Sequence, residues 1–297
     1  MVLVIGEILF DIFSAYKCIG GAPFNFAFHM KKLGFPVKFI SRVGDDSFGR
    51  EILGFLALHG FDLEDIQIDQ DYPTGSATVD MSSKSGHSFI IAKNTAYDHI
   101  NYDEIRRLLS RYQPDIIYYG TLIQRTRNSF EQFQEILSQK SQKTVSFCDI
   151  NLRPGCYTEH TITASLHASN ILKLNTDELA ELMPGSGDMA SHEVLVRKLM
   201  QIYCIETVIL TMGEKGSQWL TSGRHYRGLP EYSLDIIDTV GAGDAYAAMS
   251  VAGILKNLPF EYILPLASRF ASHVCGVQGA LIQDSAIYRE FKKRLEN

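Results

Sequence analysis

Two glycines and an acidic residue stand at the start of an apolar helix late in this 297-residue chain, in the segment DTVGAGDAYAAMS at residues 238–250. Gly241 and Gly243 allow backbone conformations with positive φ and leave backbone N–H groups uncovered. Uncovered N–H groups at the start of a helix bind anions. The sequence therefore predicts an anion site, with the carboxylate of Asp244 inside it and available for chemistry.

This glycine loop differs from the two common nucleotide-binding loops. The chain contains no GxxxxGK[ST] sequence, which excludes a P-loop, and GAGDAY lacks the third glycine of a dinucleotide-binding fingerprint. The segment from Asp244 to Lys256 has the length and the small apolar side chains of a buried helix. Taken alone, GAGD has a second reading, a glycine cap that runs into a new helix without binding a ligand.

Several strands must position this loop and its partners. The apolar run MVLVIG at residues 1–6 is typical of a strand buried on both faces. Further strands are predicted at 37–44, 115–120, 144–150, 171–175 and 207–213, and helical patterns follow most of them. This alternation predicts an α/β fold with a doubly wound, mainly parallel sheet.

The polar segments fall where these strands end. Asp11 follows the first strand, and GGAPFN at 20–25 opens the first helix. DINLR at 149–153, NTDE at 175–178 and TMGEKGS at 211–217 each follow a later strand. Because ligands bind beyond the carboxyl ends of the strands in an open α/β sheet, these segments are expected to meet at one edge.

One region breaks the alternation of strand and helix. Residues 66–93 alternate apolar and polar side chains around a Ser-Gly turn, which predicts two or three antiparallel strands. Such an insertion is expected to form a lid over the site, and an edge hairpin is the alternative. The sequence has no linker or repeat, so we predict a single domain over residues 1–297 with lid segments at about 12–19 and 66–96.

Composition and charge exclude several other classes of protein. The formal charge of −6, without a run of Lys or Arg, argues against a nucleic-acid partner. No apolar stretch approaches the roughly 18 residues that a membrane span needs. Five cysteines without a CxxC pair, and a first segment without a basic leader, predict a cytoplasmic protein with free thiols.

Two separate motifs resemble those of the ribokinase-like sugar kinases, also called the phosphofructokinase-B type. DTVGAGDAYAA resembles the C-terminal signature of this family, and GGAPFNFAFHMKKLGFPVKFISRVG at 20–44 resembles its N-terminal signature. The resemblance covers essentially the whole chain and implies a ribokinase-like fold that uses ATP and Mg²⁺. Its N-terminal part is carried by Gly20, Gly21, Asn25, Gly34 and Gly44.

The resemblance implies how the glycine loop would act. Asp244 would be the general base that takes the proton from a sugar hydroxyl as it attacks the γ-phosphate of ATP. Its carboxyl group is expected to be solvated, at its ordinary pKa, and kept ionised by the start of the helix. The N–H groups around Gly241, Ala242 and Gly243 would form the anion hole for the transferring phosphoryl group.

The same resemblance assigns the nucleotide end of the site. Asn175 and Glu178 resemble the family element that helps to place Mg²⁺ and the phosphates through water, although an N-cap with a first-turn acid is the other reading of this pair. A nucleotide-binding segment is implied at Thr211, Gly213 and Gly216, with a simple turn into the next strand as the other reading. A monovalent-cation site, for K⁺ in some members, is implied at Asp238 and the carbonyl of Val240.

The sugar end most resembles that of bacterial fructokinases. Asp11, Gly21 and Asn25 resemble the residues that contact the sugar, because carboxylate and amide groups pair well with neighbouring hydroxyls. Arg153 is expected to face the substrate or its phosphate. Gln124 and Arg125 are further candidates for this end, with a salt bridge as an equally good reading of Arg125.

Two departures from the family pattern bear on the identity of the sugar. Phe24 stands where a small residue is usual beside the sugar pocket and is expected to narrow it. Ile150 replaces the proline of a D-P-N-x-R pattern and is expected to loosen that turn. Both departures affect the choice of sugar and leave phosphoryl transfer intact.

Other functions on the same fold stay open beside a fructokinase. One is a kinase for 2-keto-3-deoxygluconate, ribose or a nucleoside, and for the keto acid Arg153 could supply the cation that a carboxylate needs. The other is a non-catalytic sugar-binding or regulatory protein, although the base and the anion hole are both present. Some members pair their lids, so a homodimer through the lid is a candidate assembly.

Overall fold

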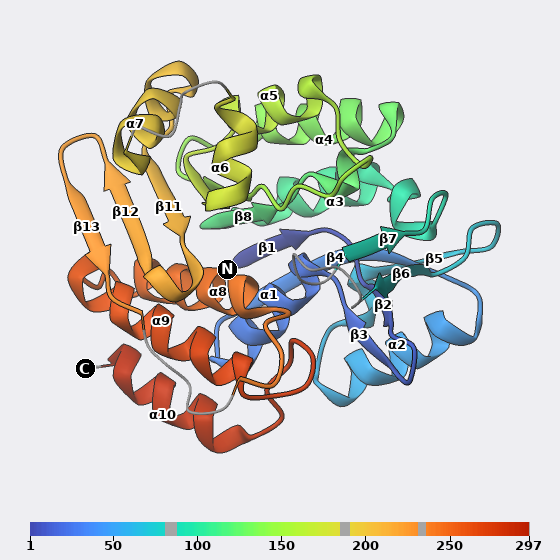
Figure 1. Ribbon diagram of the computed structural model, residues 1–297. Coiled ribbons are helices and arrows are strands. Elements are labelled where there is room, and N and C mark those ends of the chain that lie inside the picture. The colour runs from blue at the N-terminus through green and yellow to red at the C-terminus, as the bar shows by residue number, and fades with distance from the viewer. Residues whose placement is uncertain (81–87, 185–190, 231–235, 297) are drawn as a thin grey trace.

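The computed structural model of this protein describes residues 1–80, 88–184, 191–230 and 236–296. The described strands form two sheets, a large one and a small one (Figure 1). The strands of the large sheet are, along the chain, β1 (Val2–Ile5), β4 (Val37–Gly44), β5 (Ile66–Asp69), β8 (Ile116–Tyr119), β9 (Val145–Asp149), β10 (Ile171–Asn175), β11 (Thr207–Thr211), β12 (Ser217–Thr221) and β13 (His225–Gly228).

The large sheet is mainly parallel, as the alternation of strands and helices predicted. Its strands lie in the order β13-β12-β11-β10-β9-β8-β1-β4-β5. Pairing is parallel from β5 to β11, and β12 and β13 are added antiparallel at one edge. Strand β1 lies between β8 and β4 with all four residues buried, which explains its continuous apolar sequence.

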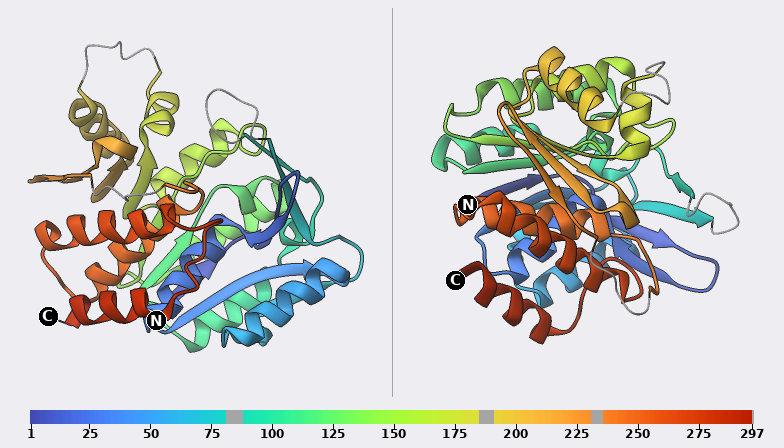
Figure 2. Two further views of the ribbon diagram at one scale, coloured as in Figure 1. Left: turned by 60° about the horizontal axis from the view of Figure 1, so that its bottom comes forward. Right: turned by 60° about the vertical axis from the view of Figure 1, so that its left-hand side comes forward.

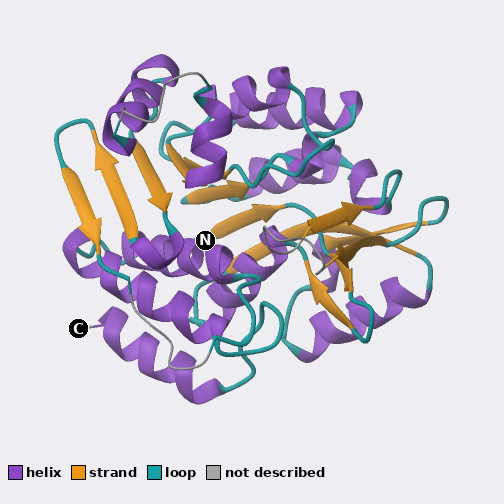
Figure 3. Ribbon diagram, in the orientation of Figure 1, coloured by secondary structure: helices purple, strands orange, loops and turns teal. Residues whose placement is uncertain are grey.

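Helices cover both faces of this sheet and form two separate cores (Figure 3). In β1, Val2 and Val4 point into one core while Leu3 and Ile5 point into the other, as the alternation of side chains along a strand requires. One face carries α3 (Tyr102–Arg111), α4 (Arg127–Gln139), α5 (Glu159–His167), α6 (Thr176–Leu182) and α7 (His192–Tyr203), and the other carries α1 (Ala22–Lys32), α2 (Ser47–Leu58), α8 (Ala242–Leu255), α9 (Phe260–Cys275) and α10 (Ser285–Glu296).

The small sheet stands at the end of the molecule away from β12 and β13 (Figure 2). Its strands are β2 (Leu9–Ile12), β3 (Lys17–Gly20), β6 (Gly75–Asp80) and β7 (Ser88–Ile91), in the order β3-β2-β6-β7. The pairs β2–β3 and β6–β7 are antiparallel, and a parallel pair of β2 and β6 joins them. The expected lid therefore has a sheet of its own, of mixed pairing.

The expected lid boundaries differ from those of this small sheet in both segments. Strand β2 begins at Leu9, before the predicted range 12–19. Strand β5 lies within the predicted range 66–96, but it pairs in parallel with β4 at the edge of the large sheet. The expectation was wrong there because the alternating sequence IQID fits a strand in either sheet, and only its partner decides between them. Residues 81–87 of the predicted lid lie outside the described residues.

Four short 3₁₀ turns complete the described elements, and η2 and η3 lie near the small sheet. They are η1 (Leu63–Asp65), η2 (Ala96–His99), η3 (Leu122–Gln124) and η4 (Gly213–Lys215). Among the described helices, none combines the length and the apolar character that crossing a membrane would require.

Candidate active site

An open cleft of about 470 Å³ lies where the parallel strands end, between the large sheet and the small sheet. Glu7 follows β1, while Asp149, Asn175 and Thr211 are the last residues of β9, β10 and β11, and all four line the cleft. The cleft brings together most of the predicted site residues: Asp11, Gly21, Asn25, Arg153, Asn175, Glu178, Thr211, Val240, Gly241, Gly243 and Asp244.

Asp244 lies in the first turn of α8 and is paired with α1. Asn25 Nδ2 donates a hydrogen bond of 2.8 Å to Asp244 Oδ2. Burial and, to a smaller extent, the nearby carboxylate of Asp149 raise the pKa of Asp244 to about 7, against the opposing effect of the hydrogen bond from Asn25. The expectation of an ordinary pKa is therefore wrong, although the side chain is only half-buried at the wall of the open cleft. A carboxylate with this pKa is a stronger base than a solvated aspartate.

The backbone of the glycine loop presents N–H groups to the cleft. Gly241 has a φ of 79° and is the N-cap of α8, which begins at Ala242, two residues earlier than predicted. The amides of Gly243 and Asp244 have no hydrogen-bond acceptor in the part of the chain that the structure describes. Of the three amides predicted for the anion hole, that of Ala242 donates to Thr239 O at 3.3 Å, whereas those of Gly241 and Gly243 have no acceptor among the described residues.

Gly241 is required by two independent features. Its φ of 79° disfavours any L side chain, and an added Cβ would lie 2.2 Å from Ala280 Cβ. We expect Gly241→Ala to lower the free energy of unfolding by roughly 2–4 kcal/mol, from backbone strain and overpacking together. Gly155→Ala is the matched control, because Gly155 has a φ of 75° with nothing within 4 Å of an added Cβ.

Urea unfolding of both glycine variants separates the two effects. The Gly155 variant measures the cost of the positive φ alone, so the Gly241 variant should be the less stable of the two. Equal losses in both variants would contradict the close contact between Gly241 and Ala280.

Lys173 and Asp149, which both line the cleft, form a buried ion pair that the sequence analysis missed. Lys173 Nζ lies 2.8 Å from Asp149 Oδ2 and 3.0 Å from Oδ1, and Tyr118 donates its hydroxyl to Asp149 at 3.0 Å. Burial, the largest single effect, would lower the pKa of Lys173, but the charge and hydrogen bond of Asp149, together with the charges of Glu178 and Asp244, outweigh it and raise the pKa. A Cβ on Gly243 would lie 3.4 Å from Lys173 Nζ, so this ammonium group faces the glycine loop. Its signal in the sequence was a lysine inside the apolar strand ILKLN.

Asn175 and Glu178 form a capping box at the start of α6. Asn175 Oδ1 accepts hydrogen bonds of 2.9 Å from the amides of Asp177 and Glu178, and Glu178 Oε2 accepts one of 2.7 Å from the Asn175 amide. Glu178 Oε1 accepts a further bond of 3.0 Å from the Leu152 amide. The capping interpretation is confirmed, and the same two side chains also line the cleft.

Some predicted residues lie outside the described walls of the cleft. Gly213 and Gly216 belong to the turn between β11 and β12, where both have positive φ. Asp238 supports the glycine loop, since its carboxylate accepts hydrogen bonds from the Val240 amide at 3.0 Å and from the Gly279 amide at 3.1 Å. No group of three His, Cys, Asp or Glu side chains placed to hold a metal ion occurs in the described ranges.

At the other end of the cleft, β2 and the start of α1 supply polar groups. Asp11 is buried, and its burial raises its pKa to about 6 against the opposing charge of Arg153. Gly21 has a φ of 110°, and an added Cβ would lie 2.6 Å from Glu7 O, so the chain can pass here only with glycine. Glu7, which the sequence analysis also missed, is a buried cleft residue whose pKa burial raises to about 7.

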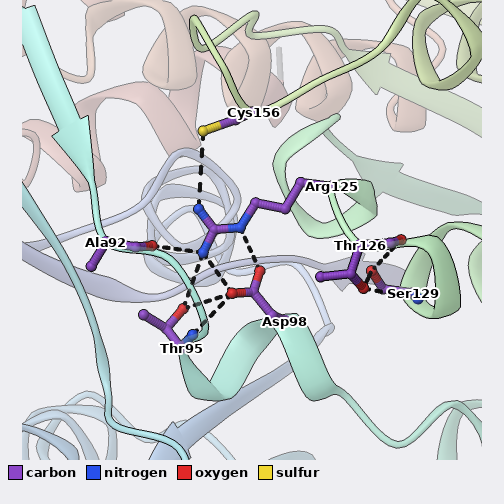
Figure 4. Close-up of polar contacts among 7 residues, drawn as sticks. All are labelled: Ala92, Thr95, Asp98, Arg125, Thr126, Ser129 and Cys156. Atoms are coloured by element: carbon purple, nitrogen blue, oxygen red, sulfur yellow. Dashed lines mark hydrogen bonds and ion pairs between the residues drawn. The ribbon is translucent and has the colours of Figure 1, made fainter.

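Two other residues predicted for the sugar end, Gln124 and Arg125, are not among the residues that line the cleft. Gln124 is buried, and its Nε2 donates to Gly120 O at 3.0 Å and to Ser165 Oγ at 3.1 Å. Arg125 forms a buried ion pair with Asp98, which confirms the salt-bridge alternative and corrects the expectation that it faces the substrate (Figure 4).

The two departures from the family pattern have structural explanations. Phe24 is fully buried in the core, where its ring packs near those of Phe28, Phe39, Phe55 and Phe61, so it does not narrow the cleft. Ile150 is also fully buried, and the turn after it is made by residue 151 with a φ of 42°.

Proteins of known activity resemble this chain along most of its length. Fructokinase-2 of Oryza sativa subsp. japonica is 28% identical over 254 residues, which cover 81% of this chain and 72% of that protein. The 5-dehydro-2-deoxygluconokinase of Shouchella clausii is 26% identical over 265 residues, which cover 87% of this chain and 80% of that protein.

A solved structure of a related fold agrees with the described architecture. The fructokinase of Vibrio cholerae, in its fructose-, ADP- and calcium-bound form, superposes with a TM-score of 0.81 at 20% identity over 97% of both chains. The model of the pfkB family of carbohydrate kinases matches residues 13–286. With both signature segments on one cleft and this match over most of its length, the chain belongs to the pfkB carbohydrate kinase family.

Proposed function

We propose that this chain is an ATP-dependent kinase that transfers the γ-phosphoryl group to a primary hydroxyl of a neutral sugar, with fructose as the first candidate. The observation that carries the proposal is the Asn25–Asp244 hydrogen bond beside the amides of Gly243 and Asp244, which have no acceptor among the described residues. This arrangement puts a base and an anion site within one turn of a helix. The fructose-bound neighbour of the same fold supports the choice of sugar.

In the proposed reaction, the sugar hydroxyl lies against Asp244 and its oxygen attacks the γ-phosphorus of ATP. The new oxygen–phosphorus bond forms while the bond from the γ-phosphorus to the β,γ-bridging oxygen breaks, and ADP leaves. The hydroxyl proton passes to Asp244. The amides of Gly243 and Asp244, with the ammonium group of Lys173, would stabilise the charge on the transferring group.

The nucleotide end of the cleft fits an Mg²⁺ ion that arrives with ATP. Mg²⁺ keeps several of its waters and binds through one or two carboxylates together with substrate phosphates. Both oxygens of Glu178 already accept backbone hydrogen bonds, so we propose that it reaches the ion through a water, beside Asn175. Asp238 and the carbonyl of Val240 remain the proposed site for K⁺.

The charges of the cleft favour a neutral sugar. Of the two cationic side chains in the described walls of the cleft, Lys173 is paired with Asp149. The carboxylate of a sugar acid would meet more negative than positive groups and would bind less well. The cleft-lining acids are Glu7, Asp11, Asp149, Asp177, Glu178 and Asp244, and the second cation is Arg153.

A sugar acid such as 2-keto-3-deoxygluconate is the second candidate substrate. Arg153 lines the cleft and could pair with its carboxylate, and one relative is a 5-dehydro-2-deoxygluconokinase. ADP release from MgATP with fructose, tagatose, glucose, ribose, adenosine and 2-keto-3-deoxygluconate separates the candidates. Turnover on fructose supports the proposal, and turnover only on the acid moves the substrate class. Sugar binding without turnover on any of them would favour a regulatory protein.

The pKa of Asp244 predicts the pH dependence of the reaction. Asp244 must be ionised to accept a proton, so kcat/KM for the sugar should fall as pH drops below about 7 and level off above it. The Asn25 side chain lowers this pKa, so Asn25→Leu should move the rise to higher pH. Profiles of kcat/KM against pH for both proteins check this, and an unchanged midpoint would rule out Asp244 as the titrating group.

Location and assembly complete the proposal. We place the enzyme in the cytoplasm, where ATP is available. A homodimer through the small sheet remains a prediction, and Ile90 of β7, which is 70% exposed, gives it a test. If the small sheets pair, Ile90→Lys should shift the protein toward monomer in sedimentation experiments.

A further inference from the structure

The small sheet is attached to the rest of the protein by a buried arginine. Arg125 directly follows η3, and its Nε and Nη2 donate hydrogen bonds of 2.6 Å to the two carboxylate oxygens of Asp98 (Figure 4). Its Nη2 also donates to Ala92 O at 2.7 Å. The two side chains are only 8% and 1% exposed, so this pair is shielded from water and salt. We call this set of contacts the Arg125 clamp.

The clamp holds a whole turn of the chain rather than one residue. Asp98 Oδ2 also accepts hydrogen bonds from the Thr95 amide at 2.9 Å and from the Thr95 hydroxyl at 3.3 Å, which closes the capping box of η2. The guanidinium carbon of Arg125 lies 5.1 Å from the centre of the Tyr97 ring. A planar fork is needed for the paired hydrogen bonds and for the ring contact, and a lysine would provide neither fork nor plane.

This turn is continuous with one wall of the cleft. Ala92 directly follows Ile91, the last residue of β7, and Ile91 lines the cleft. Tyr97 packs in a small apolar cluster with Leu9, Ala77 and Leu122, and these three residues also line the cleft. The clamp therefore sets the position of an apolar part of the cleft wall, and the base-bearing start of α8 lines the same cleft.

The chain segment that leads into β6 of the small sheet is held by a separate set of hydrogen bonds. Thr74, just before β6, donates its hydroxyl to Asp46 Oδ1 at 2.8 Å and its amide to Asp46 Oδ2 at 2.8 Å. Asp46 is the N-cap of α2, so this contact joins the start of β6 to a helix that packs on the large sheet. The chain that leaves the small sheet after β7 is held by the Arg125 clamp, together with hydrogen bonds from the Ala96 amide to Pro73 O at 2.8 Å and from Arg42 Nη1 to His99 O at 2.5 Å.

We propose that Arg125 is a positioning residue that holds the small sheet at the distance from α8 that sugar binding requires, without touching the sugar. The inference rests on the proposed sugar site. The nucleotide end is built by the ends of β10 and β11 and by α6, which are not part of the clamp. Loss of the clamp should therefore weaken sugar binding and alignment while nucleotide binding stays the same.

Arg125→Lys is the central test, because it keeps the charge and removes the fork. We expect kcat/KM for the sugar to fall by roughly 10²-fold, the scale for a misplacement of about 1 Å, while the Kd for ADP stays within about twofold. The matched control is Arg127→Lys, since Arg127 is 90% exposed and its ion-pair partner among the described residues is Glu131 on the surface of α4. Unchanged sugar kinetics in the Arg125 variant, or an equal loss of sugar and ADP binding, would overturn the proposal.

A second variant and a second measurement keep the test independent of turnover. Asp98→Asn removes the ionic partner from the other side, and the double variant should be no slower than either single one if both act through the clamp. Amide hydrogen exchange at Ala92, whose N–H is bonded to Ser76 O at 2.9 Å, should speed up in both variants. If the wild type turns over no sugar, the proposed function fails, yet this exchange still decides whether the clamp holds the sheet. Unchanged exchange would reject it.

Discussion

Replacing Asp244 with Asn is expected to lower kcat by roughly 10²- to 10⁴-fold, the contribution of general-base catalysis, while the Kd values for sugar and ADP stay nearly the same. The side chain keeps its size, and its oxygen can still accept the 2.8 Å hydrogen bond from Asn25. Only the capacity to take a proton is lost. Single-turnover kinetics together with calorimetric binding of sugar and ADP separate the chemical step from binding.

The control for this variant is an acid at another helix start. Asp284 precedes α10, is exposed, and accepts a hydrogen bond of 2.7 Å from the Ala286 amide, so Asp284→Asn removes the same charge away from the cleft. Its kcat should match that of the wild type. Near wild-type turnover in the Asp244 variant would show that another group accepts the proton.

The second large effect is expected from Lys173. Lys173→Gln should lower kcat by roughly 10²- to 10³-fold, the cost of removing one group that stabilises developing charge. The ammonium group of Lys173 faces Gly243 of the glycine loop, and it also lowers the pKa of Asp244. The variant should therefore be slow at every pH, and its pH profile should shift to higher pH.

Two further variants separate the loss of the cation from the exposure of Asp149 as an unpaired buried charge. In the double variant Asp149→Asn/Lys173→Gln, neither charge remains. If Lys173 acts on the phosphoryl group, the double variant stays slow, whereas recovery of kcat would mean that Lys173 only neutralises Asp149. Lys140→Gln is the remote control, because Lys140 donates to Thr144 O just before β9, at the other end of the sheet.

The sequence was sufficient for features that depend on local pattern. The fully buried run of β1 and the small-residue helix α8 could be predicted because burial on every side leaves no polar residue in the pattern. The two glycines of the loop differ in outcome, since Gly241 has the positive φ that the sequence analysis allowed for both, whereas Gly243 lies inside α8 without one.

The features of the fold and of the site that the sequence analysis missed depend on contacts between distant segments of the chain. Strand β5 could not be assigned to a sheet from IQID, because its partner β4 lies more than twenty residues earlier. The pKa of Asp244 depends on burial and on Asp149, neither of which is visible in GAGD. Lys173 was overlooked because a charged residue inside an apolar strand gives no sign of its partner until β9 and β10 are paired.

The most direct test of the central claim is to incubate the protein with MgATP and fructose and to identify the product. ADP release shows whether the reaction depends on the sugar, and proton-coupled phosphorus NMR shows which hydroxyl carries the phosphate. Phosphoryl transfer to a primary hydroxyl gives sugar-dependent ADP and a phosphomonoester signal split by the two protons of the adjacent CH₂ group. That result, lost in the Asp244→Asn variant, is the one we predict. ADP release that does not depend on any sugar, or a product phosphorylated on a secondary hydroxyl, would contradict it.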